Sequence, residues 1–293
     1  MTQFSKIGQQ LRTHRMETGL RTEEIAARLG VSRAAYYRYE KGEVIKLDTV
    51  TRVAELMNIP VLKLLGIGME YYSSPIEYLK RILQIEDSTD QIIQLCGPIF
   101  YPTTSNEYDS TLEQVILEWM DTSGIDHGVA QTDSGQVLNA LSLRKLTFAE
   151  RRPSVIAIFS PSAIEKFIEE GIGGNIPLSA RLKKQSLDVA RYEIELMVSL
   201  MESEPIGLQF GLSSGEVNGP FVLMRTSNER SILAINPFPS DATPNSQRGV
   251  AMITSMEDAV MSHQQIAEAR WRGSTKGVAA AKQIKALLAA KKT

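Results

Sequence analysis

Gly30 lies between two short amphipathic segments, and this arrangement restricts the fold of the N-terminal region more than any other feature of the sequence. The first segment, TEEIAARL at 22–29, has helical spacing of the apolar residues Ile25, Ala26 and Leu29. Glycine readily adopts the left-handed conformation that ends a helix. Thr22 and Ser32 are favourable N-cap residues. We therefore predict two helices, capped by Thr22 and Ser32 and joined by a tight turn at Gly30.

The second of these helices has an unusual outer face. Within SRAAYYRYE, residues 32–40, Tyr36 and Tyr39 fall three apart and are expected to point inward. The residues then left outside are Arg33, Ala34, Tyr37 and Arg38. Small side chains allow a close approach to base edges, arginine offers a donor fork that suits guanine, and Ser32 can meet a phosphate or a base. Tyr37 can stack on a sugar or contact a thymine methyl group. Two helices joined in this way form a helix-turn-helix, whose second helix lies in the DNA major groove.

Three more helices complete the expected N-terminal domain. One runs to about Thr18 with the apolar face Phe4, Ile7 and Leu11, one carries Val50, Val53, Ala54 and Met57, and one covers IPVLKLLG. We therefore predict an all-α, five-helix domain over residues 1–68. Residues 1–66 hold 11 Lys and Arg against 7 Asp and Glu, a net charge of +4, whereas the remainder of the chain has a net charge of −6. A basic head on an acidic body is typical of a nucleic-acid-binding domain fused to another domain.

Residues 5–66 resemble the helix-turn-helix of Cro and lambda repressor, the xenobiotic-response-element (XRE) family of bacterial regulators. The resemblance is carried by LRTHRMETGLRTEEIAARLGVSRAAYYRYEKGE and VAELMNIPVLKLL, with signature positions at Ala26, Gly30, Val31, Ser32, Glu40 and Gly42. It implies that Ser32, Arg33 and Ala34 read bases, that Arg38 adds a base or backbone contact, and that Thr22 approaches a phosphate through its backbone. The full expected DNA-binding set is Thr22, Ser32, Arg33, Ala34, Tyr37, Arg38 and Lys41.

Glu23 departs from that family pattern, in which glutamine is common at this position. A carboxylate repels phosphate, so Glu23 is not expected to contact DNA. An alternative use of the same domain is a protein-interaction module of the antitoxin type, which inhibits a partner by binding it.

The rest of the chain is expected to hold a second domain. Residues 69–90 are predicted to be a linker with a connecting helix, because GIGMEYYSSP at 66–75 has the composition of a hinge and IEYLKRILQI is amphipathic. For residues 91–275 we predict an α+β fold with a small, partly antiparallel sheet. Its expected strands are 154–160, 206–212, 220–227 and 230–238, with helices at about 110–121, 136–151, 178–202 and 256–272.

The order of these C-terminal features loosely resembles the uncharacterised domain that follows the same helix-turn-helix in many actinobacterial regulators. The resemblance lies in SVIAIFSPSAIEKFIEEG, in a long helix followed by a strand beginning GPFVLM, and in a final helix with EDAVMSHQQIAEAR. It brings no catalytic motif and no assigned ligand. Residues 276–293 are predicted to be a basic tail with a solvated face.

Catalytic and metal chemistry have little support in the sequence. GLSSG at 211–215 matches the nucleophile-elbow pattern around Ser213, but that motif needs a helix next, and EVNGPFVLM reads as loop and strand. His14, His127 and His263 lack partners at ligand spacing. GIGGN at 171–175 indicates a helix stop rather than a dinucleotide loop. Cys96, the single cysteine, lies among apolar residues and is expected to be buried and inert. We expect no enzyme activity, metal or cofactor; a hydrolase domain tethered to the DNA-binding head is the weaker alternative.

Six methionines suggest an adaptable core or an apolar ligand pocket: Met197, Met201, Met224, Met252, Met256 and Met261. Core packing is the more common use of such residues, so both interpretations stay open. The single cysteine, the absence of an apolar signal segment and the short apolar runs favour a cytoplasmic protein without a membrane span.

Together these features predict a sequence-specific transcriptional regulator, expected to be a repressor. It would bind double-stranded operator DNA, palindromic in sequence, as a homodimer or a higher oligomer. The C-terminal domain would then sense a small-molecule effector or mediate oligomerisation.

Overall fold

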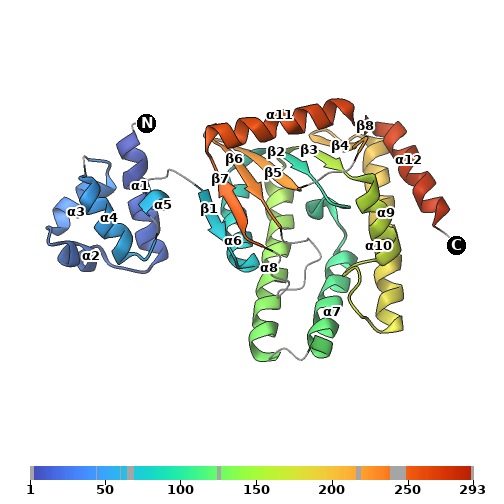
Figure 1. Ribbon diagram of the computed structural model, residues 1–293, viewed down its shortest axis with the longest axis horizontal. Helices are drawn as coiled ribbons and strands as arrows, with labels where there is room; N and C mark the ends of the chain where they lie inside the picture. Colours follow the sequence, from blue (N-terminus) through green and yellow to red (C-terminus); the bar gives the residue numbers. More distant parts are fainter. Residues whose placement is uncertain are drawn as a thin grey trace. The chain divides into compact units, whose positions relative to one another are not determined.

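The chain divides into two compact units, Met1–Glu70 and Tyr71–Thr293. The computed structural model describes residues 3–43, 45–59, 61–64, 69–123, 127–215, 219–237 and 249–291 (Figure 1). Of the expected hinge, residues 66–68 lie outside this described part. Within it, no helix is long and apolar enough to cross a membrane.

The N-terminal unit consists of the five helices that the sequence predicts. They are α1 (Gln3–Glu17), α2 (Thr22–Leu29), α3 (Arg33–Glu40), α4 (Leu47–Leu56) and α5 (Val61–Leu64). The predicted inner faces meet in one apolar core, which contains Ile7, Leu11, Ile25, Ala26, Leu29, Tyr36, Val50, Val53, Ala54 and Met57. Tyr39 packs against this core from its edge. The side chain of Phe4, the remaining residue of the predicted α1 face, lies outside the described part.

The C-terminal unit is built on an eight-stranded mixed sheet, so the prediction of a small sheet is wrong. The strand order is β1-β7-β6-β5-β2-β3-β4-β8. The strands are β1 (Met69–Tyr72), β2 (Thr89–Leu95), β3 (Ser154–Phe159), β4 (Leu208–Leu212), β5 (Phe221–Thr226), β6 (Ser231–Ile235), β7 (Ala251–Thr254) and β8 (Thr275–Lys276). The sheet is partly antiparallel as expected: β2, β3 and β4 run parallel, whereas β5, β6 and β7 form antiparallel pairs beside β2.

Successive residues of each central strand face opposite sides of the sheet, because side chains alternate with a period of two. Ile92 joins the larger core, whereas its neighbour Ile93 packs against the smaller one. On β5, Met224 joins the larger core and Leu223 joins the smaller core. Both faces of the sheet are therefore buried.

Helices cover these two faces unequally (Figure 1). α11 (Glu257–Gly273) supplies Val260 and Ala267 to the smaller core. The other helices supply the larger core: α6 (Pro75–Glu86), α7 (Asn106–Ser123), α8 (His127–Arg151), α9 (Pro161–Glu170), α10 (Ala180–Ser203) and α12 (Gly277–Ala290). The connection from β2 to β3 contains α7 and α8, and the connection from β3 to β4 contains α9 and α10, as parallel neighbours require a crossover.

Two segments that were expected at the margins of the second domain contribute to its core. Residues 69–90, expected to be a linker with a connecting helix, contain β1, α6 and the start of β2. Residues 276–293, expected to be a solvated tail, contain α12, which buries Ala280, Ala281, Ile284 and Leu288. The alanine-rich composition of α12 allows close packing against its neighbours, while its lysines remain on the outer side of the helix.

Candidate nucleic-acid interface

The turn between α2 and α3 has the geometry that the sequence predicts. Gly30 follows α2 with φ of 73° and ψ of 28°, in the left-handed region. Its N–H donates to the Ala27 carbonyl at 3.2 Å, and the Val31 N–H donates to the Ala26 carbonyl at 3.0 Å. These bonds satisfy the last carbonyls of α2 and direct the chain into the next helix.

The two predicted helix caps have different outcomes. Ser32 caps α3, because its hydroxyl oxygen accepts from the Ala35 N–H at 3.1 Å. Thr22 does not cap α2: Arg21 occupies that position, with its N–H bound to the Glu24 carboxylate at 3.0 Å. Thr22 is instead the first residue of the helix, and its side chain is buried. A DNA contact by Thr22 is therefore restricted to its backbone.

The outer face of α3 presents the residues that the sequence analysis expected there. Ser32, Arg33, Ala34, Tyr37 and Arg38 are exposed, as is Lys41 directly after the helix. The Arg33 and Arg38 side chains are 60% and 62% exposed. The structure thus brings the exposed members of the predicted DNA-binding set onto one short helix and its end.

Arg33 is held in place by residues of both helices. Its Nε lies 2.9 Å from Oε1 of Glu23 in α2, and its guanidinium carbon lies 5.4 Å from the centre of the Tyr37 ring. Hydrogen bonds from Arg33 and Thr22 lower the pKa of the Tyr37 phenol. The guanidinium has further N–H groups beyond those that bind Glu23 and Tyr37, and these can donate to a base edge.

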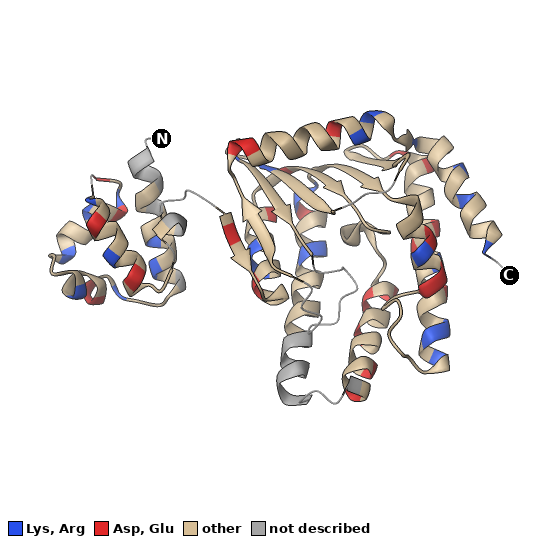
Figure 2. Ribbon diagram, viewed as in Figure 1, with Lys and Arg blue, Asp and Glu red and all other residues tan. Residues whose placement is uncertain are grey.

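The charge on this face is nearly balanced. Arg38 Nε lies 3.7 Å from Oε2 of Glu43, a looser pair than Arg33–Glu23. Basic and acidic residues are interspersed over the helices of the N-terminal unit (Figure 2). The carboxylates therefore offset part of the attraction that the basic side chains of this face would have for phosphates.

The orientation of α3 is fixed by α1 on its inner side. Arg15 Nε donates to Oε1 of Glu40 at 2.6 Å and Arg15 Nη2 donates to Oε2 at 3.3 Å, a bidentate pair in which the Glu40 side chain is 4% exposed. Two turns away in α1, Gly8 lies directly against the end of α3 and the residues after it: a Cβ at this position would be 2.6 Å from the carbonyl oxygen of Glu40 and from the amide nitrogen of Gly42. The absence of a side chain at Gly8 therefore allows the two helices to approach closely.

The serine motif of the C-terminal unit lacks the architecture of a nucleophile elbow. Ser213 is buried directly after β4, and its N–H donates to the Phe159 carbonyl at 2.9 Å. The next regular element is the strand β5 rather than a helix. In the described part of the chain, Ser213 is a strand-end residue whose backbone extends the sheet.

The described histidines and the cysteine have the surroundings of structural residues. His263 donates from Nδ1 to the Ala259 carbonyl at 2.8 Å and packs edge-on against Phe221. His14 lies in the N-terminal unit, and the side chain of His127 falls outside the described part. Cys96 is 1% exposed, and its burial raises the pKa of the thiol. Among the described residues there is no group of three or more metal-ligating side chains.

The six methionines do not converge on one cavity. Met197, Met201 and Met224 are buried in the larger core. Met256 and Met261 are 48% and 50% exposed. These six methionines therefore do not form a common ligand pocket.

The helix stop predicted at residues 171–175 is present, because Gly171 ends α9 with φ of 72°.

Two ion pairs at this interface were not predicted from the sequence. Glu23 was identified as an unusual residue, but its partner Arg33 lies on the next helix. Glu40 was recognised only as a signature position, and its partner Arg15 is 25 residues away in α1. The opposite charges of these residues were visible in the sequence. Which residues pair could be recognised only from the angle between the helices.

The comparisons with known proteins agree with this geometry. Residues 6–62 match a family model described as a helix-turn-helix domain. Over 57 residues the chain is 42% identical to a protein of Pyrococcus furiosus named as an HTH-type transcriptional regulatory protein. This similarity covers 19% of the present chain and 18% of that relative, less than a fifth of each. Residues 6–62 therefore form a helix-turn-helix domain of the XRE type.

Proposed function

We propose that this chain is a sequence-specific DNA-binding transcriptional regulator. The observation that supports the proposal most strongly is the outer face of α3, where Arg33, Ala34 and Tyr37 are exposed beside the N-capped start of the helix. An interface that recognises another protein is typically centred on a cluster of large anchors that become fully desolvated. This face instead carries a donor fork, a small residue and a phenol, which suit base edges and sugars.

Each residue has a proposed role. Arg33 reads a guanine with its terminal amino groups, while Glu23 and Tyr37 set the direction of its side chain. Ala34 allows the helix to approach the groove. Ser32 can donate its hydroxyl proton to a phosphate, because its oxygen already accepts from Ala35. Arg38 and Lys41 contact phosphates at the other end of the helix, and the first N–H groups of α2, beginning at Thr22, meet a further phosphate.

We further propose that the protein acts as a repressor and binds DNA as a homodimer. Two heads in a dimer would recognise half-sites about 34 Å apart, or a multiple of this spacing. The C-terminal unit, Tyr71–Thr293, has its own core and contains most of the chain. Its proposed role is to sense a small molecule or to mediate oligomerisation, and not to catalyse a reaction.

The test is binding of the purified full-length protein to labelled fragments of its own promoter, measured by fluorescence anisotropy with excess nonspecific competitor. Arg33→Ala should weaken binding to the preferred sequence by about 5- to 150-fold, the equivalent of one bidentate base contact, and should relax the choice of one base pair. Arg12→Ala is the matched control, because Arg12 is an exposed arginine of the same unit on α1.

The measurement is repeated at two salt concentrations. Specific binding that resists the competitor and weakens with salt supports the proposal. If Arg33→Ala weakens binding to all sequences equally, Arg33 contacts a phosphate and its base-reading role is wrong. Absence of preference for any promoter fragment, together with stable co-purification of a protein partner, would instead favour an antitoxin-type module.

A further inference from the structure

The C-terminal unit contains a cavity of about 380 Å³ between α6, α8 and the sheet. It lies where β2 ends and β5 begins, so that Gln94 and Leu95 of one strand border the space together with Phe221 and Val222 of the other. Pockets of about 300–1,000 Å³ are typical of small-molecule sites. This cavity has the volume of a site for a compact molecule.

The walls are mainly aromatic and aliphatic. Three tyrosines line the space together with Ile82, Ile99 and Met224: Tyr78 from α6, Tyr101 after β2, and Tyr108 from α7. Tyr78, Ile82 and Glu86 follow at intervals of four residues, so α6 presents one continuous face to the cavity. Apolar walls with a few placed polar groups are characteristic of sites that bind organic ligands.

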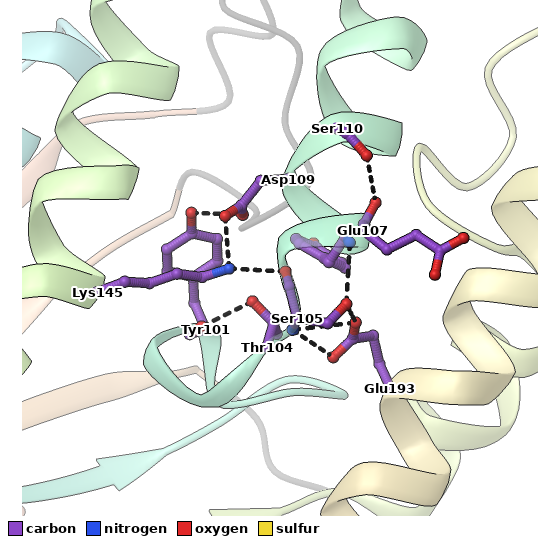
Figure 3. Close-up of polar contacts among 9 residues, drawn as sticks. Tyr101, Thr104, Ser105, Glu107, Asp109, Ser110, Lys145 and Glu193 are labelled. Atoms are coloured by element: carbon purple, nitrogen blue, oxygen red, sulfur yellow. Dashed lines mark hydrogen bonds and ion pairs between the residues drawn. The ribbon is translucent and has the colours of Figure 1, made fainter. Parts of the chain in front are cut away.

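A polar network outside the cavity fixes two of these walls (Figure 3). The Tyr101 hydroxyl donates to Oδ1 of Asp109 at 2.8 Å, and Lys145 donates to Oδ2 of Asp109 at 2.6 Å. Ser105 caps the first turn of α7 by accepting from the Tyr108 N–H at 3.1 Å, and the buried Glu193 carboxylate accepts from the Ser105 N–H. Tyr101 and Tyr108 are thus positioned before any ligand arrives, which lowers the entropy cost of binding.

One charged pair lies in the cavity wall. Arg144 of α8 donates from Nε and Nη2 to the Glu86 carboxylate at distances of 2.6–3.1 Å. These are the only charged residues among the described residues that line the cavity. Because they neutralise each other, a charged ligand would find no further counter-charge in the wall, and burial of an unpaired charge is costly. Arg144 has further N–H groups beyond those that bind Glu86, and these can donate to a ligand oxygen.

We propose that this cavity binds an uncharged, largely apolar small molecule that carries a carbonyl or hydroxyl oxygen, with Arg144 as its polar anchor. The binding site itself does not depend on the proposed function. Its consequence does rest on that function, because a bound effector would alter the DNA affinity of the N-terminal unit. α6 is placed for this role, because it lines the cavity with one face and is the first helix of the chain after the N-terminal unit. Coupling requires that the ligand bind two arrangements of the protein with different affinity.

The test uses prodan, an uncharged naphthyl ketone whose fluorescence shifts to the blue in apolar surroundings. It is titrated with the full-length protein in the absence of DNA. Val222→Phe fills the cavity from the partly buried wall of β5 and should weaken prodan binding at least tenfold. The matched control Val278→Phe adds the same volume at a position on α12 that is 66% exposed, and it should leave the affinity within twofold of the wild type.

Gln94→Phe provides an independent variant, because Gln94 is the cross-strand partner of Val222 and lines the same cavity. Thermal unfolding shows which of the two variants, Val222→Phe or Gln94→Phe, remains folded. The prodan affinity of that variant is then compared with the affinity of the wild type. No saturable blue-shifted binding by the wild type, or equal binding by a folded cavity-filled variant, overturns the proposal.

A second arm separates this proposal from the DNA-binding function. With saturating prodan, the dissociation constant for promoter DNA should change at least fivefold. Cavity binding without specific DNA binding would refute the proposed function and leave the ligand site standing. If DNA affinity is unaltered when prodan occupies the cavity, only the regulatory consequence is refuted.

Discussion

Gly8→Ala tests whether α1 and α3 approach as closely as described. Two effects oppose each other at this position. Alanine is favoured over glycine in a helix by about 1 kcal/mol. Against this, the new Cβ would lie 2.6–2.8 Å from three backbone atoms of Tyr39, Glu40 and Gly42. Overpacking typically costs about 1–3 kcal/mol, and contacts with backbone atoms belong at the upper end because no side chain can rotate away. The expected net loss of stability is about 2 kcal/mol.

The matched control is Gly135→Ala, because Gly135 lies inside α8 and its added Cβ would meet nothing within 4 Å. There the helix preference is unopposed, so local stability should rise by about 0.5–1 kcal/mol.

Hydrogen exchange of the full-length protein, followed by mass spectrometry, reads both changes in one experiment because it reports local opening. Amides of α1 and α3 should exchange about 30-fold faster in Gly8→Ala, as 2 kcal/mol requires. Peptides of the C-terminal unit should be unchanged in that variant. Slower exchange in the α1 and α3 peptides of Gly8→Ala would refute the close approach of these helices.

Three further outcomes follow from the structure. Glu23→Gln removes a negative charge from the DNA-binding face but keeps an amide oxygen that can still accept from Arg33 Nε, so promoter affinity should rise about two- to tenfold at low salt and less at high salt, measured by anisotropy; an unchanged affinity at low salt would contradict this electrostatic reasoning. Burial raises the pKa of Glu193, so the folded state binds a proton more tightly than the unfolded state. The stability of the wild type relative to Glu193→Gln should therefore fall as the pH rises above about 4.3, in urea titrations at several pH values; a rise would contradict the assignment. The Cys96 thiol should not react with a thiol-specific dye until the protein unfolds, and rapid native-state labelling would show that its surroundings open.

The helices of the N-terminal unit could be predicted because their signals are local. Gly30, Ser32 and the apolar spacing of α2 each act within a few residues. Arg21 replaced Thr22 as the cap of α2 because the Glu24 carboxylate, three residues later, satisfies the Arg21 N–H. The cap of α2 therefore lies one residue earlier than predicted, because the Glu24 side chain binds the Arg21 N–H.

Four strands of the sheet were not predicted: the central strand β2, which has seven residues and was not recognised, and β1, β7 and β8, which are too short to show a pattern. β8 has two residues and β7 has four, and each becomes a strand only because a longer neighbour offers backbone partners. The cavity is a further consequence of tertiary structure. Glu86 and Arg144 are 58 residues apart, and nothing near either residue indicates that they meet.

The lengths of the two outermost strands also limit how copies of this protein could associate. β1 has four residues and β8 has two, so the sheet ends in edges that offer few unpaired backbone groups to a neighbouring molecule. Short edge strands are one way in which proteins avoid uncontrolled strand addition. A symmetric dimer built by extending the sheet from one molecule into the next is therefore disfavoured, and self-association would rely on side-chain contacts.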